Sequence, residues 1–281
     1  EDLIEQGLLT EKECDKVDFG SKTDKVDYEK LYNGRFELLK TAYEKSDISE
    51  REEFKRFKAE NAYWLKDYAM FMAIKERFNG QSFDHWAEDI KLRWEYSMEY
   101  YESELADEIT FYEFIQYEFY RQWYKLKKYA NDNGIKIIGD IPIYVAYDSA
   151  DVWAHPELFQ IDDERNPIAV AGCPPDGFSA TGQLWGNPLY KWDYHKYTNY
   201  DWWIKRIERS VKLYDVVRID HFRGFDEYYS IPAKDKDAIG GHWEKGPGID
   251  LFNGIKYCLG DINIIAEDLG YITDTVRQLV I

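Results

Sequence analysis

Short β-type runs alternate with helical segments over the second half of the chain, and this alternation constrains the fold more than any other feature. The runs cover residues 135–138, 216–219 and 262–265. Helical segments occupy residues 202–213 and 251–259, and another begins at residue 273. This order is typical of a parallel sheet with crossover helices, and it leaves a doubly wound sheet and a (β/α) barrel open. The chain has neither a GxGxxG nor a GxxxxGK(S/T) motif, which disfavours nucleotide-binding versions of the fold.

The first part of the chain, residues 1–133, reads as mostly helical and strongly charged. A capping pattern predicts a helix with Ser49 as its N-cap and a stop near Gly80. A second capping signal at Thr110 predicts another long helix that ends at residues 133–134. Aromatic residues recur at helical spacing in both helices, which favours helix–helix core over a ligand site. We therefore expect a helical subdomain over residues 1–133 and an α/β part over residues 134–281.

Charge and cysteine content exclude several classes of function. With 36 Lys+Arg against 54 Asp+Glu, the net charge is −18, which disfavours nucleic-acid binding and attachment to anionic membranes. No run approaches the ~20 apolar residues of a membrane-spanning helix. The three cysteines are distant from one another and lack CxxC spacing, so we expect neither a disulfide framework nor a structural metal site, and a cytoplasmic location. No cofactor motif is present.

Acidic residues follow each of the three β-type runs: Asp140, Asp220 and the pair Glu267 and Asp268. In barrels, active sites lie at the carboxyl ends of the strands, where such side chains converge. Two convergent carboxylates suit glycosidic-bond chemistry, one ionised to attack the sugar and one protonated to assist the leaving oxygen. Arg218 lies two residues before Asp220, so it points to the same side of the strand and favours an ionised Asp220. The alternative is that these acids serve only as turn residues or helix N-caps.

Four ordered motifs resemble those of the amylomaltases, the disproportionating enzymes or 4-α-glucanotransferases related to the α-amylases. The first is GDIPIYVAYDSADVW at residues 139–153, similar to the third-strand motif of that family. PPDGFS at residues 174–179 and GQLWGNP at residues 182–188 resemble its acceptor-side loop. VRIDHFRGF at residues 217–225 resembles the fourth-strand nucleophile motif, and IAEDLG at residues 265–270 the fifth-strand acid/base motif. The resemblance covers the whole chain, less distinctively in its first 130 or so residues.

This resemblance implies a role for each matching residue. Asp220 would be the nucleophile and Glu267 the general acid/base. Arg218 and His221 would position the nucleophile and the sugar at the cleavage point. The remaining implied substrate contacts are Asp148, Asp176, Gln183, Trp185 and Asn187.

Structural explanations stay open for several of these residues. Trp185 could be loop packing, Asn187 with Pro188 a plain turn, and His221 a structural histidine. Gly177 departs from relatives that have an aromatic residue there, which removes an expected stacking contact. The residues at 151–153 are expected to be structural.

The implied reaction is transfer of α-1,4-glucan segments between maltodextrins by double displacement with retention. A covalent intermediate can be intercepted by water or by a sugar hydroxyl, so a retaining α-glucan hydrolase and a non-catalytic glucan-binding fragment remain alternatives. No metal or cofactor is required, and the oligomeric state is open.

The resemblance also implies a partial (β/α)8 barrel, with about strands 3–5 and a large helical insertion. The family's third essential Asp and its first and last strands have no counterpart in these 281 residues. The first residues read as a cut edge in a longer chain. We therefore expect little or no activity from this chain alone.

Overall fold

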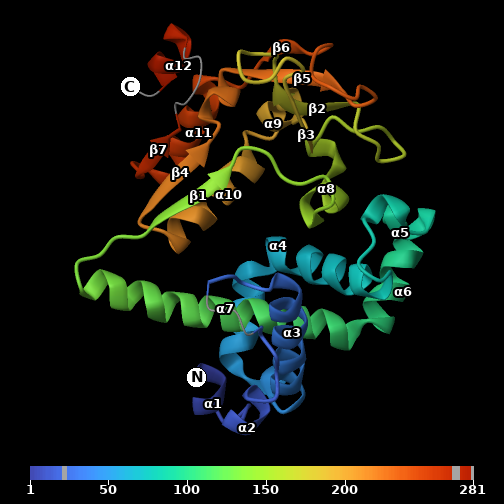
Figure 1. The fold of residues 1–281 in the computed structure, drawn as a ribbon, viewed down its shortest axis with the longest axis vertical. Coiled ribbons are helices and arrows are strands. Elements are labelled where there is room, and N and C mark those ends of the chain that lie inside the picture. Colours follow the sequence, from blue (N-terminus) through green and yellow to red (C-terminus); the bar gives the residue numbers. More distant parts are fainter. Residues whose placement is uncertain (21–23, 268–272, 280–281) are drawn as a thin grey trace. The chain divides into compact units, whose positions relative to one another are not determined.

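The computed structural model describes residues 1–20, 24–267 and 273–279 and divides the chain into two compact units (Figure 1). One unit comprises residues 1–77 and 99–123, and the other residues 78–98 and 124–281. Residues 78–98 join the second unit through aromatic contacts, such as Trp86 against Trp153 at 5.8 Å and Phe83 against Tyr147 at 5.0 Å. The expected subdomains, divided after residue 133, stay a prediction.

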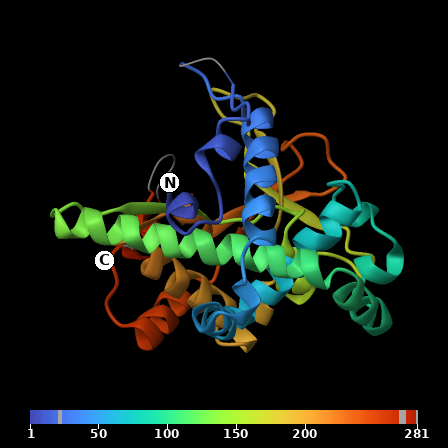
Figure 2. The ribbon, with the colours of Figure 1, turned by 90° about the horizontal axis from the view of Figure 1, so that it is seen from below.

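Helices make up the first unit, and aromatic side chains join them. Tyr43 of α3 (Tyr28–Glu44) contacts Phe111 of α7 (Ala106–Asp132) with ring centroids 5.5 Å apart, where α3 crosses α7 (Figure 2). Phe54 and Phe57 of α4 (Glu52–Arg77) each lie 5.6 Å from Tyr117 of α7. These contacts confirm helix–helix packing for part of the aromatic stripes, whereas Phe119 of the second stripe is 48% exposed. The unit also contains α1 (Asp2–Glu5), α2 (Glu11–Cys14), η1 (Ile48–Glu50) and part of α6 (Glu95–Glu104).

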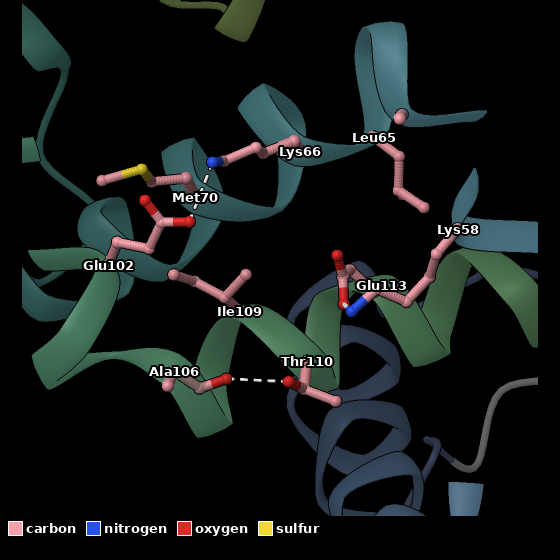
Figure 3. A pocket seen from close by; sticks show the side chains of 10 residues that line it. Lys58, Leu65, Lys66, Met70, Glu102, Ala106, Ile109, Thr110 and Glu113 are labelled. Carbon is pink, nitrogen blue, oxygen red and sulfur yellow. Dashed lines mark hydrogen bonds and ion pairs between the residues drawn. The ribbon is translucent and has the colours of Figure 1, made fainter. Parts of the chain in front are cut away.

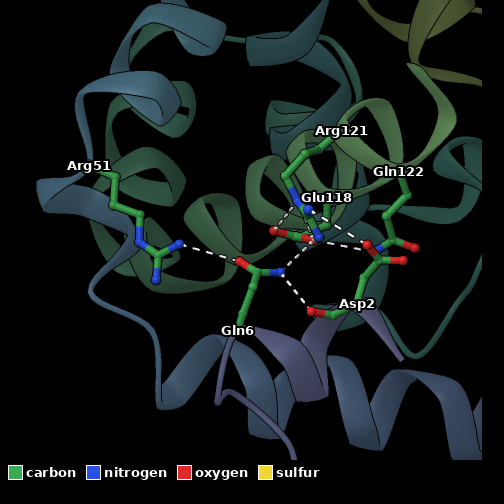
Figure 4. Close-up of polar contacts among 6 residues, drawn as sticks. All are labelled: Asp2, Gln6, Arg51, Glu118, Arg121 and Gln122. Carbon is green, nitrogen blue, oxygen red and sulfur yellow. Dashed lines mark hydrogen bonds and ion pairs between the residues drawn. The ribbon is translucent and has the colours of Figure 1, made fainter. Parts of the chain in front are cut away.

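A buried carboxylate ties the first helix to α7. Glu118 is 2% exposed and accepts hydrogen bonds from Arg121 Nη2 at 2.8 Å and Gln122 at 3.2 Å. Gln6, next to α1, donates to the same carboxylate at 3.4 Å and accepts from Arg51 at 3.4 Å (Figure 4). A buried carboxylate needs several donors to offset its lost hydration, so this network fixes where α1 lies on α7.

The second unit contains two sheets. The parallel sheet has the order β1 (Ile138–Pro142), β4 (Val216–Asp220) and β7 (Ile264–Ala266). The antiparallel sheet has the order β3 (Gln183–Pro188), β2 (Ala169–Cys173), β5 (Glu227–Pro232) and β6 (His242–Lys245). The helical elements are η2 (Phe83–His85), α5 (Glu88–Lys91), α8 (Ala150–Ala154), η3 (Pro156–Leu158), α9 (Trp192–Tyr197), α10 (Asp201–Leu213), η4 (Phe222–Phe225), α11 (Ile249–Leu259) and α12 (Asp274–Leu279).

The parallel sheet buries one face against helices. Val217 and Ile219 of β4 are fully buried, as are Trp203 and Ile207 of α10, which contacts β4 and lies beside α11 (Figure 1). Because side chains alternate along a strand, Arg218 and Asp220 must lie on the opposite face. The hydrophobic pattern of β4 therefore determines which face carries the charged residues.

Several predicted elements are confirmed and others are wrong. The helix at 202–213, the strand at 216–219 and their parallel arrangement are confirmed by α10, β4 and the β1–β4–β7 pairing. The strand expected at 135–138 instead begins at Ile138, because the ladder with β4 starts at the Ile138–Val216 pair. Asp140 consequently lies inside β1 and not after it. The antiparallel sheet was not predicted.

Both predicted N-caps in the helical part are wrong. Ser49 lies in the short η1 turn, whose Ile48 is 2% exposed, and α4 begins three residues after Ser49. Thr110 is inside α7, where its hydroxyl donates to the carbonyl of Ala106 at 2.8 Å.

Among the described residues, none of the helices combines the length and the apolar character that a membrane-spanning segment needs.

His195 of α9 is a fully buried titratable side chain. Its Nε2 lies 3.2 Å from the carbonyl of Leu158, which requires a proton on this nitrogen, and the rings of Tyr190 and Trp192 each lie 5.3 Å away. Burial lowers the pKa of His195 to about 4, because the charged imidazolium cannot be hydrated there. The folded chain therefore holds His195 neutral at pH values where the unfolded chain binds a proton.

We expect the free energy of unfolding to fall as the pH drops from about 6.5 to about 4, by about 3 kcal/mol from His195 alone. Below pH 4 both states are protonated and this contribution is constant. In urea titrations at pH 7.5 and pH 4, the His195→Gln variant should lose that part of the pH dependence. The exposed His85→Gln variant is the control and should keep it. An unchanged pH dependence in His195→Gln would contradict the assignment.

Candidate active site

The pairing of β4 with β7 brings two predicted acids to one edge of the parallel sheet. Ile219 pairs with Ala266, so Asp220 and Glu267 are the next residues on the two strands. The Glu267 amide donates to the Ile219 carbonyl at 3.1 Å, which continues the ladder beyond β7. Both acids therefore stand at the carboxyl ends of parallel strands. Asp268 lies outside the described residues.

Arg218 lies between two carboxylates on the open face of the sheet. Its Nη2 is 2.9 Å from Asp220 Oδ1, and its Nη1 is 2.8 and 2.7 Å from the two oxygens of Asp140. The prediction that Arg218 and Asp220 point to the same side is confirmed. The hydrogen bonds that Arg218 donates, above all those to Asp140, raise the pKa of Arg218, so the guanidinium stays charged. Since the carboxylates are 51% and 59% exposed, the ion pairs orient Asp220 more than they stabilise the fold.

Asp140 belongs to this cluster but was not among the predicted site residues. The register places Asp140 directly opposite Arg218, and both side chains emerge on the same face. The signal was present in the sequence as an acid near a β-type run. Its partner could be recognised only from the pairing of β1 with β4.

His221 connects the two predicted catalytic acids through its backbone. Its φ of 55° turns the chain sharply after β4, and its amide donates to Glu267 Oε2 at 3.0 Å. The Glu267 carboxylate is thus held at the peptide that directly follows Asp220. Burial lowers the pKa of the His221 imidazole, which favours its neutral form.

Trp185 of β3 lies against His221. The two rings meet edge to face with centroids 4.9 Å apart, and the indole is 37% exposed. The Trp185 Nε1 donates to Gln183 Oε1 at 3.0 Å, so the two side chains lie together. Tyr144, a buried residue that was not predicted as part of the site, lies 6.3 Å from Trp185. The antiparallel sheet therefore supplies a partly exposed aromatic side chain against His221, the residue that follows Asp220.

The other three predicted residues make contacts that hold loops. Asn187 donates to the Val145 carbonyl at 2.8 Å, and Asp148 Oδ1 accepts the Phe83 amide at 3.2 Å. Asp176 Oδ1 accepts two amides of its own loop, from residues 178 and 179, each at 2.8 Å. Substrate contact by these three side chains stays a prediction.

Known proteins resemble this chain over nearly its whole length. The family model of the 4-alpha-glucanotransferases, glycoside hydrolase family 77, matches residues 1–280. The chain belongs to this family. It is 48% identical over 277 residues to the 4-alpha-glucanotransferase of Clostridium butyricum, covering 98% of the chain and 57% of that protein. It is 42% identical over 285 residues to the chloroplastic/amyloplastic 4-alpha-glucanotransferase of Solanum tuberosum, covering 99% of the chain and 49% of that protein.

A solved structure shares the mixed α/β fold. The amylomaltase from Streptococcus agalactiae, in complex with acarbose, superimposes with a TM-score of 0.94 at 44% identity. The match covers 99% of this chain and 57% of that one. The chain thus spans about half the length of the 4-alpha-glucanotransferases that it matches.

The helical unit of this 4-alpha-glucanotransferase family member contains a cavity of about 340 Å³ (Figure 3). Its lining is apolar between two ion pairs, Lys58 with Glu113 at 2.6 Å and Lys66 with Glu102 at 2.8 Å. Burial raises the pKa of Glu113, and Lys58 opposes this shift. None of the predicted site residues lines this cavity.

No group of three or more metal-ligating side chains occurs in the part of the chain that the structure describes.

The hydrogen bond from the Phe83 amide to Asp148 allows the structural role of the Asp148 side chain to be tested. We expect Asp148→Ala to lower the free energy of unfolding by about 1–2 kcal/mol, because the Phe83 amide loses a charged acceptor. Asp148→Asn keeps an acceptor oxygen and should lose less. Urea unfolding and hydrogen exchange of the Phe83 amide measure the effect. Equal stability and exchange in Asp148→Ala and the unchanged chain would show that the contact contributes nothing.

Proposed function

We propose that the chain is the segment of a 4-α-glucanotransferase that carries its nucleophile and its general acid/base. The observation that supports this most is the pairing of β4 with β7, with the His221 amide bonded to Glu267 next to Asp220. In this proposal Asp220 is the nucleophile and Glu267 the acid/base, on a partial (β/α)8 barrel that comprises about strands 3–5.

The reaction is a double displacement with retention. The ionised Asp220 carboxylate attacks the anomeric carbon of a maltodextrin, and the protonated Glu267 donates its proton to the departing glycosidic oxygen. Glu267, now ionised, removes the proton from the 4-hydroxyl of an acceptor glucan, which displaces Asp220 and forms the new α-1,4 bond. Arg218 orients Asp220 for this attack, since its guanidinium is 2.9 Å from Asp220 Oδ1.

Transfer requires that an acceptor sugar reaches the covalent intermediate before water does. Trp185 lies against His221 and donates a hydrogen bond to Gln183. Trp185 suits this task, because a partly exposed indole stacks on the C–H face of a sugar. The proposed roles of Asp148, Asp176 and Asn187 on the substrate side follow from the family motifs.

Three carboxylates are expected in the complete site, and this chain provides two of them. We therefore propose that the 281-residue chain has little or no transferase activity by itself. We also propose a cytoplasmic location for the protein.

Incubation with maltotriose tests the activity. We expect no longer oligomers from the 281-residue chain, and glucose with maltopentaose from a longer protein that contains it. In that longer protein, Asp220→Asn should reduce transfer by roughly 10⁴-fold or more while maltotriose still binds. Asp261→Asn, at a side chain that is 90% exposed, is the matched control and should leave transfer unchanged.

The products also separate the alternatives. Only glucose and maltose from the longer protein would replace the transferase proposal with a hydrolase. Maltotriose binding without any turnover in the longer protein would leave a glucan-binding protein. Undiminished transfer by Asp220→Asn would exclude Asp220 as the nucleophile.

A further inference from the structure

The short η4 turn directly follows His221 and is tied to neighbouring segments on several sides. The Gly246 amide donates to the Asp226 carbonyl at 2.7 Å, and the Gly248 amide donates to the Phe225 carbonyl at 2.8 Å. The Asp226 carboxylate accepts the hydroxyls of Thr273 at 3.2 Å and of Thr275 at 2.7 Å. The turn thus links the end of β4 to the segment after β6 and to the start of α12.

Arg223, within η4, is buried and stacked on an indole. Arg223 is 9% exposed, and its guanidinium carbon lies 4.1 Å from the ring centroid of Trp243. Trp243 belongs to β6 and lies edge to face against Tyr229 of β5, with centroids 5.2 Å apart. A guanidinium stacked on an aromatic face is held both by its charge and by the fit of its plane. Arg223 therefore anchors the η4 turn to the antiparallel sheet.

The charge of Arg223 also acts on His221. Burial is the main cause that lowers the pKa of the imidazole, and Arg223 lowers it further. Glu267 and Asp220 act in the opposite direction. Trp185, the ring that His221 contacts from β3, carries no charge. A second positive charge next to Arg223 is disfavoured, so the arginine helps to keep His221 neutral between two carboxylates.

We propose that Arg223 is a positioning residue, which acts through its stack on Trp243 to hold η4 and thereby His221 beside Asp220 and Glu267. This inference rests on the proposed function, in which His221 contacts the sugar at the cleavage point. A neutral imidazole at that place offers one donor and one acceptor to sugar hydroxyls, whereas an imidazolium offers donors only. Arg223 in this way adds to the effect of burial in favouring the neutral form in which His221 meets the substrate.

The first experiment follows the His221 imidazole by NMR as a function of pH in the 281-residue chain. In Arg223→Met we expect the His221 titration midpoint to move to higher pH and the His221 amide resonance to shift, since that amide bonds Glu267. Arg93→Met is the matched control, because Arg93 stacks on Trp153 at 4.2 Å but does not contribute to the pKa of His221. It should leave both signals unchanged. His221→Gln identifies the resonances.

Two conservative variants keep the test decisive if Arg223→Met does not fold. Arg223→Lys retains the charge and loses the planar stack, so the midpoint should stay low while the amide resonance shifts. Trp243→Phe retains an aromatic face and should give a smaller amide shift than Arg223→Lys. An unchanged midpoint and amide resonance in every folded Arg223 variant would overturn the proposal.

The second experiment measures kcat against pH for the longer protein. Arg223→Met should move the acidic limb of the profile to higher pH, in the direction of the NMR midpoint. If the NMR midpoint moves and the profile does not, the positioning of His221 is supported and its role in glycosyl transfer is overturned. If the NMR midpoint, the His221 amide resonance and the profile are all unchanged, the positioning role itself is overturned.

Discussion

The central place of β4 in the parallel sheet is the constraint on which the candidate site depends. β4 pairs with β1 on one side and with β7 on the other, and its apolar residues Val217 and Ile219 are buried against helices. The strand therefore has a fixed register with both neighbours and a fixed face toward the helices. A slip of one residue would bury Arg218 and Asp220 and expose the apolar residues. This change would destabilise the fold by far more than the contacts within the site stabilise it.

Charged side chains on the other face are arranged by the same register. Arg218 meets Asp140 from β1 and Asp220 from its own strand, and Glu267 is fixed by the His221 amide. These contacts are between partly exposed groups, so they contribute more to orientation than to stability. The double-displacement mechanism proposed for this site needs such orientation, because the nucleophile and the acid/base must stay at a set distance from each other.

Much of the α/β framework could be predicted from the sequence, and the errors have physical causes. The strand at 216–219 and the helix before it were correct because apolar and charged residues alternate there with clear periods. Asp140 was placed after a strand because the β-type run ends at residue 138 by composition, whereas the ladder with β4 extends β1 to Pro142. β2 and β3 were missed because they contain Gly172, Gly186 and Pro188, which read as loop and are tolerated only through pairing with neighbouring strands.

The sequence by itself determined the family, the two acids at the ends of β4 and β7, and Arg218 two residues before Asp220, because motifs and strand periodicity are local properties of the chain. Only the tertiary structure decided that Asp140 shares Arg218, that Trp185 lies on His221, and that Arg223 stacks on Trp243. These partners are separated by 78, 36 and 20 residues along the chain. Sequence spacing cannot pair residues so far apart, whereas strand register and packing bring them into contact.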